Sequence, residues 1–163
     1  MHPRRLRTLL PVLLAVILVG TALWQYQHQG QAPDVIPTQA GTPVGTSDEM
    51  NLLARLIAAE AGTEPYEGQV AVGAVIMNRV RSPLFPSTIS GVIFEPWAFE
   101  SVSNGLIWQV TNLATPSRAA ADALNGWDPT YGALFFWNPS KEVSPWIWTR
   151  AIITQIGNHV FAR

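Results

Sequence analysis

One carboxylate in the sequence stands where a helix should present only apolar side chains. Leu53, Leu56, Ile57 and Glu60 follow one another at i, i+3, i+4 and i+7, the spacing of a single helix face. Burying an ionised carboxylate without a partner is costly, so such a group either accepts hydrogen bonds or stays protonated near pH 7. A protonated carboxylic acid can donate its proton to a glycosidic oxygen, which makes Glu60 the candidate general acid. The competing interpretation is a half-exposed glutamate at a helix end with no chemical role.

Aromatic residues are concentrated in the second half of the chain. Six tryptophans fall within 52 residues: Trp97, Trp108, Trp127, Trp137, Trp146 and Trp148. Core packing is the ordinary role of any single tryptophan, but six are hard to bury together in a small domain. One or two are therefore expected to line a groove, because a flat indole suits the apolar face of a sugar. Trp146 and Trp148 are predicted to point to the same side of a strand.

The remaining composition argues against several other chemistries. The 163 residues contain no cysteine and three histidines, of which His2 and His28 lie in the N-terminal region. A zinc site usually needs more imidazoles than the remaining His159, and no G-x-S-x-G motif of a serine hydrolase is present. His159 is predicted to be a satisfied strand or chain-end residue, and no metal or cofactor is expected. With 10 Lys and Arg against 11 Asp and Glu, the chain lacks the basic balance of a nucleic-acid-binding protein.

The first 46 residues are predicted to lie outside the folded domain. Three arginines at positions 4, 5 and 7 precede an uncharged apolar run at residues 9–24, the pattern of an export signal. Residues 1–24 are therefore a signal peptide or a retained membrane anchor, and both remain open because no clear cleavage site follows. Residues 25–46 are rich in Gln, Pro, Thr and Gly and are predicted to be a flexible linker.

The rest of the chain is predicted to be one α+β domain, with helices first and short antiparallel strands late. A capping-box pattern at Thr46–Glu49 starts the helix that carries Glu60, and Gly62 ends it. Pro65 then opens a helix that is apolar nearly all round and should be the buried central element. The predicted elements are helices at 47–61, 65–81 and 115–124, a loop at 82–112, and strands at 133–137, 146–148 and 155–161.

Several motifs occur in an order that resembles a known family. They are Leu52–Ala61, Glu64–Ala71, Asn78–Pro83, Gly91–Ile93, Ala123–Pro129, Trp146–Trp148 and Gly157–Arg163. Together they span essentially all of residues 47–163 and resemble the SleB/CwlJ-type cell wall hydrolases, the spore cortex-lytic enzymes. The resemblance implies a small lysozyme-like, lytic-transglycosylase-like catalytic domain that cleaves the glycan strand of peptidoglycan after N-acetylmuramic acid. It implies a single essential glutamate, which aligns with Glu60, and a role in spore cortex lysis during germination.

The resemblance also implies a mechanism with one acid. In a lytic transglycosylase the C6 hydroxyl of the sugar closes onto C1 and leaves a 1,6-anhydro end, so the substrate supplies the nucleophile. A hydrolytic muramidase would need a partner acid, for which Glu67 and Asp128 are candidates. Glu100 adds another acid to a loop that the resemblance places near the cleft. A different alternative is a non-catalytic module that binds cell-envelope glycan.

These considerations give a set of expected site residues and partners. The predicted substrate-binding residues are Gln69, Phe99, Trp127, Asn138, Trp146 and Trp148. The expected partner is the glycan strand of peptidoglycan, with no nucleic acid. The expected location is extracytoplasmic, in the cell wall or spore envelope, with membrane attachment through the N-terminus if that segment is retained.

Overall fold

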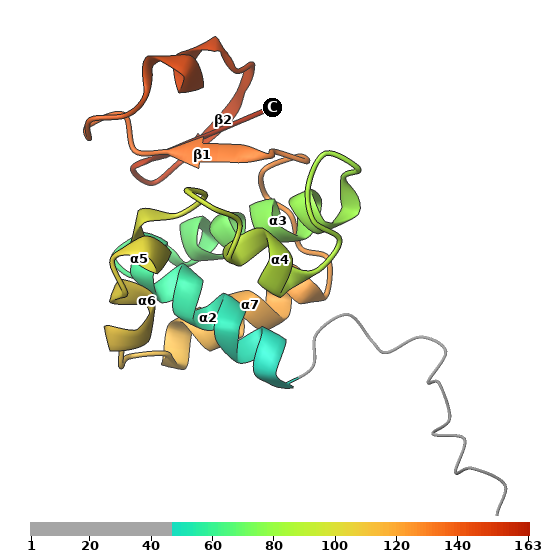
Figure 1. Cartoon of the computed structure of the whole chain (residues 1–163), viewed down its shortest axis with the longest axis vertical. Coiled ribbons are helices and arrows are strands. Elements are labelled where there is room, and N and C mark those ends of the chain that lie inside the picture. The colour runs from blue at the N-terminus through green and yellow to red at the C-terminus, as the bar shows by residue number, and fades with distance from the viewer. Residues whose placement is uncertain (1–46) are drawn as a thin grey trace, which may run out of the picture. The chain divides into compact units, whose positions relative to one another are not determined.

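The computed structural model describes residues 47–163, with helices first and strands last (Figure 1). This is the α+β arrangement that the sequence predicted. The predicted signal or anchor segment at 1–24 and the linker at 25–46 lie outside the described residues. Within the described part of the chain, no helix is both long enough and apolar enough to cross a membrane.

Three longer helices form a helical layer, and they match the helices predicted from the sequence. They are α2 (Ser47–Ala61), α3 (Tyr66–Arg81) and α7 (Ala114–Leu124). The middle helix, α3, is buried from Gly68 to Met77 and contacts both α2 and α7. Pro65 is the residue that precedes α3, where its fixed φ and missing N–H suit a helix start.

A glycine allows the three helices to pack closely. A Cβ at Gly73 of α3 would lie 2.9 Å from the Cβ of Ala123 on α7 and 3.1 Å from the Cδ1 of Ile57 on α2. A larger residue at this position would separate the helices. Small residues at the crossing point therefore fix the position of α2, the helix that carries Glu60.

The stretch 82–112 is not the plain loop that the sequence predicted. It contains three short helices: α4 (Ile89–Ile93), α5 (Glu100–Ser103) and α6 (Leu106–Gln109). The first is capped by Thr88, whose hydroxyl accepts a hydrogen bond from the backbone N–H of Gly91 at 3.0 Å. Each helix is too short to display a hydrophobic period, so the sequence pattern does not reveal it. Buried side chains such as Ile89 and Ile107 hold them against the helical layer.

An antiparallel sheet follows the helices, with strand order β1-β3-β2. Its strands are β1 (Phe135–Trp137), β2 (Ile152–Ile156) and β3 (His159–Ala162). Phe136 and Phe161 are partners across β1 and β3, and with Val75 of α3 they join sheet to helices. Trp137 and Val160 point to the opposite face, which the segment between β1 and β2 covers (Figure 1). Both faces of this small sheet are therefore packed.

The predicted strand at 146–148 is wrong. Trp146 and Trp148 lie in a 3-10 helix, η1 (Pro145–Thr149), that begins at a proline, which fits a helix start but not a strand interior. Both indoles nevertheless contact β1, at residues two apart on that strand. The Trp146 ring meets Phe135 edge-on at 5.4 Å between centroids, and the Trp148 ring meets Trp137 at 5.3 Å.

The predicted strand at 155–161 is two strands joined by a turn. Gly157 has a left-handed φ of +59° and reverses the chain between β2 and β3. The Gly157-Asn158 pair at this reversal is typical of a tight turn and separates the two strands.

Candidate active site

Glu60 lies in the last turn of α2, with its side chain half-buried. Leu56 and Ile57, one turn earlier, are completely buried, so Glu60 stands where the buried stripe of the helix reaches the surface. Ser101 of α5, itself buried, donates a hydrogen bond from its Oγ to Oε1 of Glu60 at 2.5 Å. Packing of α5 on α2 therefore supplies a fixed hydrogen-bond donor for one oxygen of this carboxyl group.

The pKa of Glu60 is raised above its ordinary value of 4.5. Burial is the largest cause, because it disfavours the charged form. The Ser101 hydrogen bond and the charge of Lys141 oppose the shift, whereas the negative charge of Glu100 adds to it. The site thus favours a proton on Glu60 and also holds groups that stabilise the anion once that proton has left.

Lys141 and Glu100 reach Glu60 from two separate segments. Lys141 is exposed on the segment that follows β1, and Glu100 is the exposed first residue of α5. The acid that acts electrostatically on Glu60 is therefore Glu100, the residue expected near the cleft. The charge of Lys141 also acts on Glu64 and His159, so these side chains form one electrostatic cluster.

Glu64, one turn of chain after Glu60, is held as an anion. The backbone N–H of Asn158 donates to its Oε2 at 2.8 Å, and the Asn158 side-chain amide donates to its Oε1 at 3.0 Å. Burial by itself would raise the pKa of Glu64, but these hydrogen bonds, with the charges of His159 and Lys141, hold it below 4.5. This residue ties the turn between α2 and α3 to the turn between β2 and β3.

His159 begins β3 and is buried. Its Nδ1 lies 3.8 Å from Oε1 of Glu64 and has no hydrogen-bond partner, so the satisfied histidine predicted from the sequence is not what the structure shows. Burial lowers its pKa, although the charge of Glu64 opposes the shift. The ring also meets Phe136 edge-on at 5.4 Å. The structure thus places a buried imidazole beside the acidic cluster.

Gln69 is the predicted binding residue whose side chain joins this cluster. It is buried at the start of α3, and its Nε2 donates to the backbone oxygen of Glu64 at 3.1 Å. Its Oε1 has no hydrogen-bond partner. The residue lines a cavity of about 370 Å³ together with Ala58 and Gly62 at the end of α2. A buried amide oxygen without a donor is therefore present beside the turn that follows Glu60.

Two other predicted binding residues have local structural contacts. Phe99 is buried at the residue preceding α5 and stacks on Phe136 with ring centroids 6.3 Å apart. The side-chain oxygen of Asn138 accepts a hydrogen bond from the backbone N–H of Ser140 at 2.9 Å, which shapes the turn after β1. Both residues position segments that carry Glu60's neighbours, Ser101 and Lys141.

Within residues 47–163 the tryptophans divide into one buried residue and five exposed ones. Trp137 is 5% exposed, whereas Trp97, Trp108, Trp127, Trp146 and Trp148 are 93%, 58%, 45%, 51% and 50% exposed. Trp127 contacts Tyr66 and lies after α7, whereas Trp146 and Trp148 lie over β1. The expectation that the six tryptophans could not all be buried is therefore confirmed.

Neither predicted partner acid is in a position that suggests a second catalytic group. Glu67 is exposed in the first turn of α3. Asp128 accepts hydrogen bonds from the Asn78 side chain, from both polar groups of Thr130 and from the N–H of Gly132. Burial alone would raise the pKa of Asp128, but these hydrogen bonds hold it low, as expected for a residue that organises a turn.

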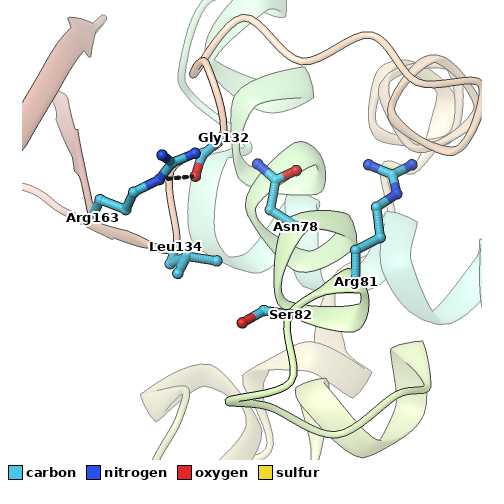
Figure 2. A pocket seen from close by; sticks show the side chains of 6 residues that line it. All are labelled: Asn78, Arg81, Ser82, Gly132, Leu134 and Arg163. Carbon is cyan, nitrogen blue, oxygen red and sulfur yellow. Dashed lines mark hydrogen bonds between the residues drawn. The ribbon is translucent and has the colours of Figure 1, made fainter.

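Two further cavities lie along α3. One, of about 320 Å³, is lined from both layers of the domain, by Arg79 of α3 and Phe135 of β1 among others. The other, of about 290 Å³, lies at the C-terminal end of α3 and is framed by Arg81 and Arg163 (Figure 2). Arg163 is held there by a hydrogen bond from its Nε to the Gly132 oxygen at 3.1 Å. Glu60 precedes the opposite end of α3, so this second cavity is not part of its surroundings.

The sequence did not single out Ser101, Lys141, Glu64 or Asn158 as site residues. A capping pattern or helical period does not report hydrogen bonds between residues far apart in the chain. The one available signal was the pair Gly157-Asn158 after an apolar run, typical of a tight turn whose amides are free to bind a carboxylate. In residues 47–163, no three His, Cys, Asp or Glu side chains gather as a metal site would require.

Comparison with known proteins identifies close relatives of this domain. The family model described as Cell Wall Hydrolase matches residues 63–162. The spore cortex-lytic enzyme of Bacillus subtilis (strain 168) is 51% identical over 123 residues, which cover 75% of this chain and 40% of that protein. This chain therefore spans less than half the length of that relative.

Solved structures agree with this assignment. The crystal structure of the catalytic domain of the Bacillus cereus SleB protein is 48% identical, with a TM-score of 0.68 over 77% of this chain and 99% of that one. The catalytic domain of the germination-specific lytic transglycosylase SleB from Bacillus anthracis is 47% identical, with a TM-score of 0.70 over 76% and 100% of the two chains. The fold is thus that of a SleB catalytic domain.

Proposed function

The chain belongs to the cell wall hydrolase family, and from this premise we propose that it cleaves the glycan strand of peptidoglycan as a lytic transglycosylase with Glu60 as its general acid. The observation that supports this role best is the raised pKa of Glu60 beside a fixed hydroxyl donor. A carboxylic acid that keeps its proton near neutral pH is what departure of a sugar oxygen requires.

The proposed reaction uses the same carboxyl group twice. Ser101 donates hydrogen bonds to Glu60 from its Oγ and from its backbone, the Oγ bond reaching Oε1, and in the proposed reaction Oε2 carries the proton. Glu60 donates that proton to the bridging oxygen after N-acetylmuramic acid as the C1–O bond breaks. The resulting carboxylate, stabilised by Ser101 and by the charge of Lys141, then accepts the proton of the C6 hydroxyl as its oxygen bonds to C1. The product is a 1,6-anhydro end, and no water is consumed.

The relatives suggest the biological substrate. Similar proteins are named spore cortex-lytic enzymes, and one solved relative is described as a germination-specific lytic transglycosylase. We propose by analogy that this chain acts on spore cortex peptidoglycan during germination. In this scheme residues 47–163 are the catalytic domain, residues 1–24 direct it out of the cytoplasm or anchor it, and residues 25–46 link the two.

The substrate-binding roles remain proposals with unequal support. Gln69 is favoured by its unpaired buried oxygen, and Trp127, Trp146 and Trp148 by their exposed rings. Phe99 and Asn138 would act indirectly, by holding α5 and the turn after β1 in place.

Product analysis of digested sacculi tests the proposal directly. Purified sacculi with muramic lactam and vegetative sacculi are incubated with the full chain, and the released fragments are identified by mass spectrometry. Anhydro ends support the proposed reaction, whereas new reducing ends indicate a hydrolytic muramidase. Saturable binding without release of fragments indicates a glycan-binding module. Glu60→Gln should release nothing, while the matched control Glu67→Gln, on the exposed first turn of α3, should digest at the parent rate.

A further inference from the structure

Arg79 is a buried cation with unused hydrogen-bond donors. Its side chain is 8% exposed, and its Nε donates to the backbone oxygen of Leu134 at 2.8 Å. Its guanidinium carbon lies 5.1, 5.4 and 5.8 Å from the ring centroids of Phe85, Phe99 and Phe135. Among residues 47–163, no group accepts a hydrogen bond from its Nη nitrogens. Ring contacts offset part of the cost of burying the charge but give these N–H groups no acceptor.

The cavity of about 320 Å³ introduced above is the space that Arg79 faces. Its lining includes aromatic rings from both layers and one acid: Phe85, Glu95, Trp97, Phe135 and Trp146. Trp97 is 93% exposed and has a left-handed φ of +67°, which is costly for a tryptophan. A large apolar side chain is thus held at the cavity's edge without burying its own surface.

A second cation stands beside the same rings. The guanidinium carbon of Arg150 lies 4.4 Å from the Trp146 centroid and 5.6 Å from the Phe135 centroid. Its Nε is buried without a hydrogen-bond partner, while one Nη donates to the Thr149 hydroxyl at 3.2 Å. Two guanidinium groups therefore lie beside Phe135, whereas Glu95 is the one carboxylate in the lining of the cavity. The surroundings of the cavity carry an excess of positive charge and of free N–H donors.

We propose that this cavity binds a carboxylate carried by the glycan strand, with Arg79 as its main hydrogen-bond donor. The inference rests on the proposed function for its choice of substrate. A planar guanidinium matches the two oxygens of a carboxylate, and the exposed indole of Trp97 offers a surface for the attached sugar or peptide.

The cavity is linked to the Glu60 site through its wall. Phe136 lines the cavity and stacks on Phe99, which immediately precedes the helix that carries Ser101. In the proposal, the carboxylate bound at Arg79 belongs to the same strand that presents its glycosidic oxygen to Glu60. Two carboxylates of peptidoglycan have the required chemistry: the unsubstituted lactyl group of N-acetylmuramic acid and the stem peptide attached to it.

Binding of uncleavable ligands tests this assignment. N-acetylglucosaminyl-N-acetylmuramic acid ends at its muramic residue and so lacks the glycosidic bond that the proposed reaction cleaves. Calorimetry with the full chain therefore measures its affinity alone. Two matched pairs of ligands are compared. The first pair is this disaccharide with a free lactyl carboxylate and the same disaccharide with a lactyl amide. The second pair carries L-Ala-D-Glu on the lactyl group, in acidic form and in amidated form. At least one acidic ligand should bind about tenfold more tightly than its neutral partner, the value expected for hydrogen bonds to a charged group. Whichever pair shows the difference identifies the source of the carboxylate.

Variants show whether Arg79 causes the difference. Arg79→Gln should bring acidic and neutral ligands to within about twofold, while Arg81→Gln, an exposed arginine on the same helix, should leave the preference intact. If Arg79→Gln fails to fold, the affinity of Glu95→Gln for acidic ligands tests the proposal in its place. Loss of that competing carboxylate should tighten acidic ligands by about threefold and leave neutral ones unchanged.

The proposal is overturned if neither ligand pair differs, if folded Arg79→Gln keeps the preference, or if Glu95→Gln leaves the affinity for acidic ligands unchanged. Its failure is distinguishable from failure of the proposed function. Anhydro ends in the sacculus digest together with equal affinities would reject the carboxylate site alone. Acid-selective binding without anhydro ends would reject the transglycosylase reaction alone.

Discussion

Glu60 and Glu64 lie four residues apart and have opposite electrostatic environments. Glu60, at the end of α2, has one side-chain donor, Ser101, and burial raises its pKa. Glu64, in the following turn, has two donors from Asn158, and they overcome burial and lower its pKa. The charge of Lys141 acts on both. Hydrogen bonds from Ser101 lower the pKa of Glu60, as those from Asn158 lower the pKa of Glu64, so the two groups differ in which influence prevails: burial at Glu60, and hydrogen bonds with nearby positive charge at Glu64.

In the proposed reaction this contrast separates a reactive group, Glu60, from a structural one, Glu64. A group with a raised pKa is destabilising when it ionises, and that is tolerated where the proton is to be used. A group with a lowered pKa stabilises the fold when ionised, here by joining the α2–α3 turn to the β2–β3 turn. Substitution of Glu60 should accordingly change the catalytic rate, whereas substitution of Glu64 should change the free energy of unfolding.

The largest expected effect is on catalysis by Glu60→Gln. Removing a general acid should lower the rate of anhydro-muropeptide release by about 100-fold to 10,000-fold. The melting temperature at pH 8 should not fall, because glutamine cannot ionise in this half-buried position. Since burial raises the pKa of Glu60, its ionisation costs stability above its ordinary pKa of 4.5, so any stabilisation by the variant should disappear as the pH falls below that value. A stable variant with parent activity would show that Glu60 is not the acid.

Gly157→Ala should disturb the hydrogen bonds of Glu64 with Asn158 through a steric clash, without changing any charge. The backbone there has a φ of +59°, and an added Cβ would collide with Oε2 of Glu64 and lie 2.9 Å from the Cδ of Pro65. The left-handed conformation and the overpacking together should cost about 2 to 4 kcal/mol of unfolding free energy. Urea denaturation measures this loss of unfolding free energy.

Gly105→Ala provides the control. Gly105 has a φ of +79° with nothing within 4 Å of the added Cβ, so this variant should show only the cost of the left-handed conformation. Equal losses in the two variants would contradict the proposed collision.

Glu64→Gln should reduce stability by a smaller amount, about 1 to 3 kcal/mol at pH 7, because Asn158 would face an amide in place of a carboxylate. The pKa of Glu64 is lowered on folding, so its contribution is present above 4.5 and is lost as the pH falls through the native pKa. The difference between parent and variant should therefore shrink on acidification, as at Glu60, but with the opposite sign, because here the parent is the more stable protein at pH 7. Chemical denaturation at pH 7 and pH 3.5 checks this. A difference that is constant with pH would show that Glu64 is not held as a stabilising anion.

The helices and the position of Glu60 could be predicted because their signals are local. The capping box at Thr46–Glu49, Pro65 and Gly62 mark helix ends, and the apolar period places Glu60 on a defined face. The strand prediction failed at Trp146 and Trp148 because aromatic composition does not distinguish a strand from a short 3-10 helix that begins at proline.

The rest of the site could not be predicted because it depends on contacts between distant segments. Ser101 reaches Glu60 across 41 residues, and Asn158 reaches Glu64 across 94. No spacing rule connects such positions, and the short helix that carries Ser101 has no period to reveal it. Glu100 was expected near the cleft from family resemblance, but its electrostatic effect on Glu60 required coordinates.

The smallest expected effects are opposite shifts of the pH profile by two exposed charges near Glu60. Lys141 lowers the pKa of Glu60 and Glu100 raises it, so Lys141→Gln should move the alkaline limb of the activity profile to higher pH and Glu100→Gln should move it to lower pH. Both side chains are exposed, so each shift should be at most about half a pH unit and should shrink at high salt. Initial rates of muropeptide release from pH 4 to 9, at low and high ionic strength, provide the measurement. Glu142→Gln, also exposed and adjacent to Lys141, is the control that should leave the limb in place. Shifts of the same sign in the two variants would mean that the alkaline limb reports a group other than Glu60.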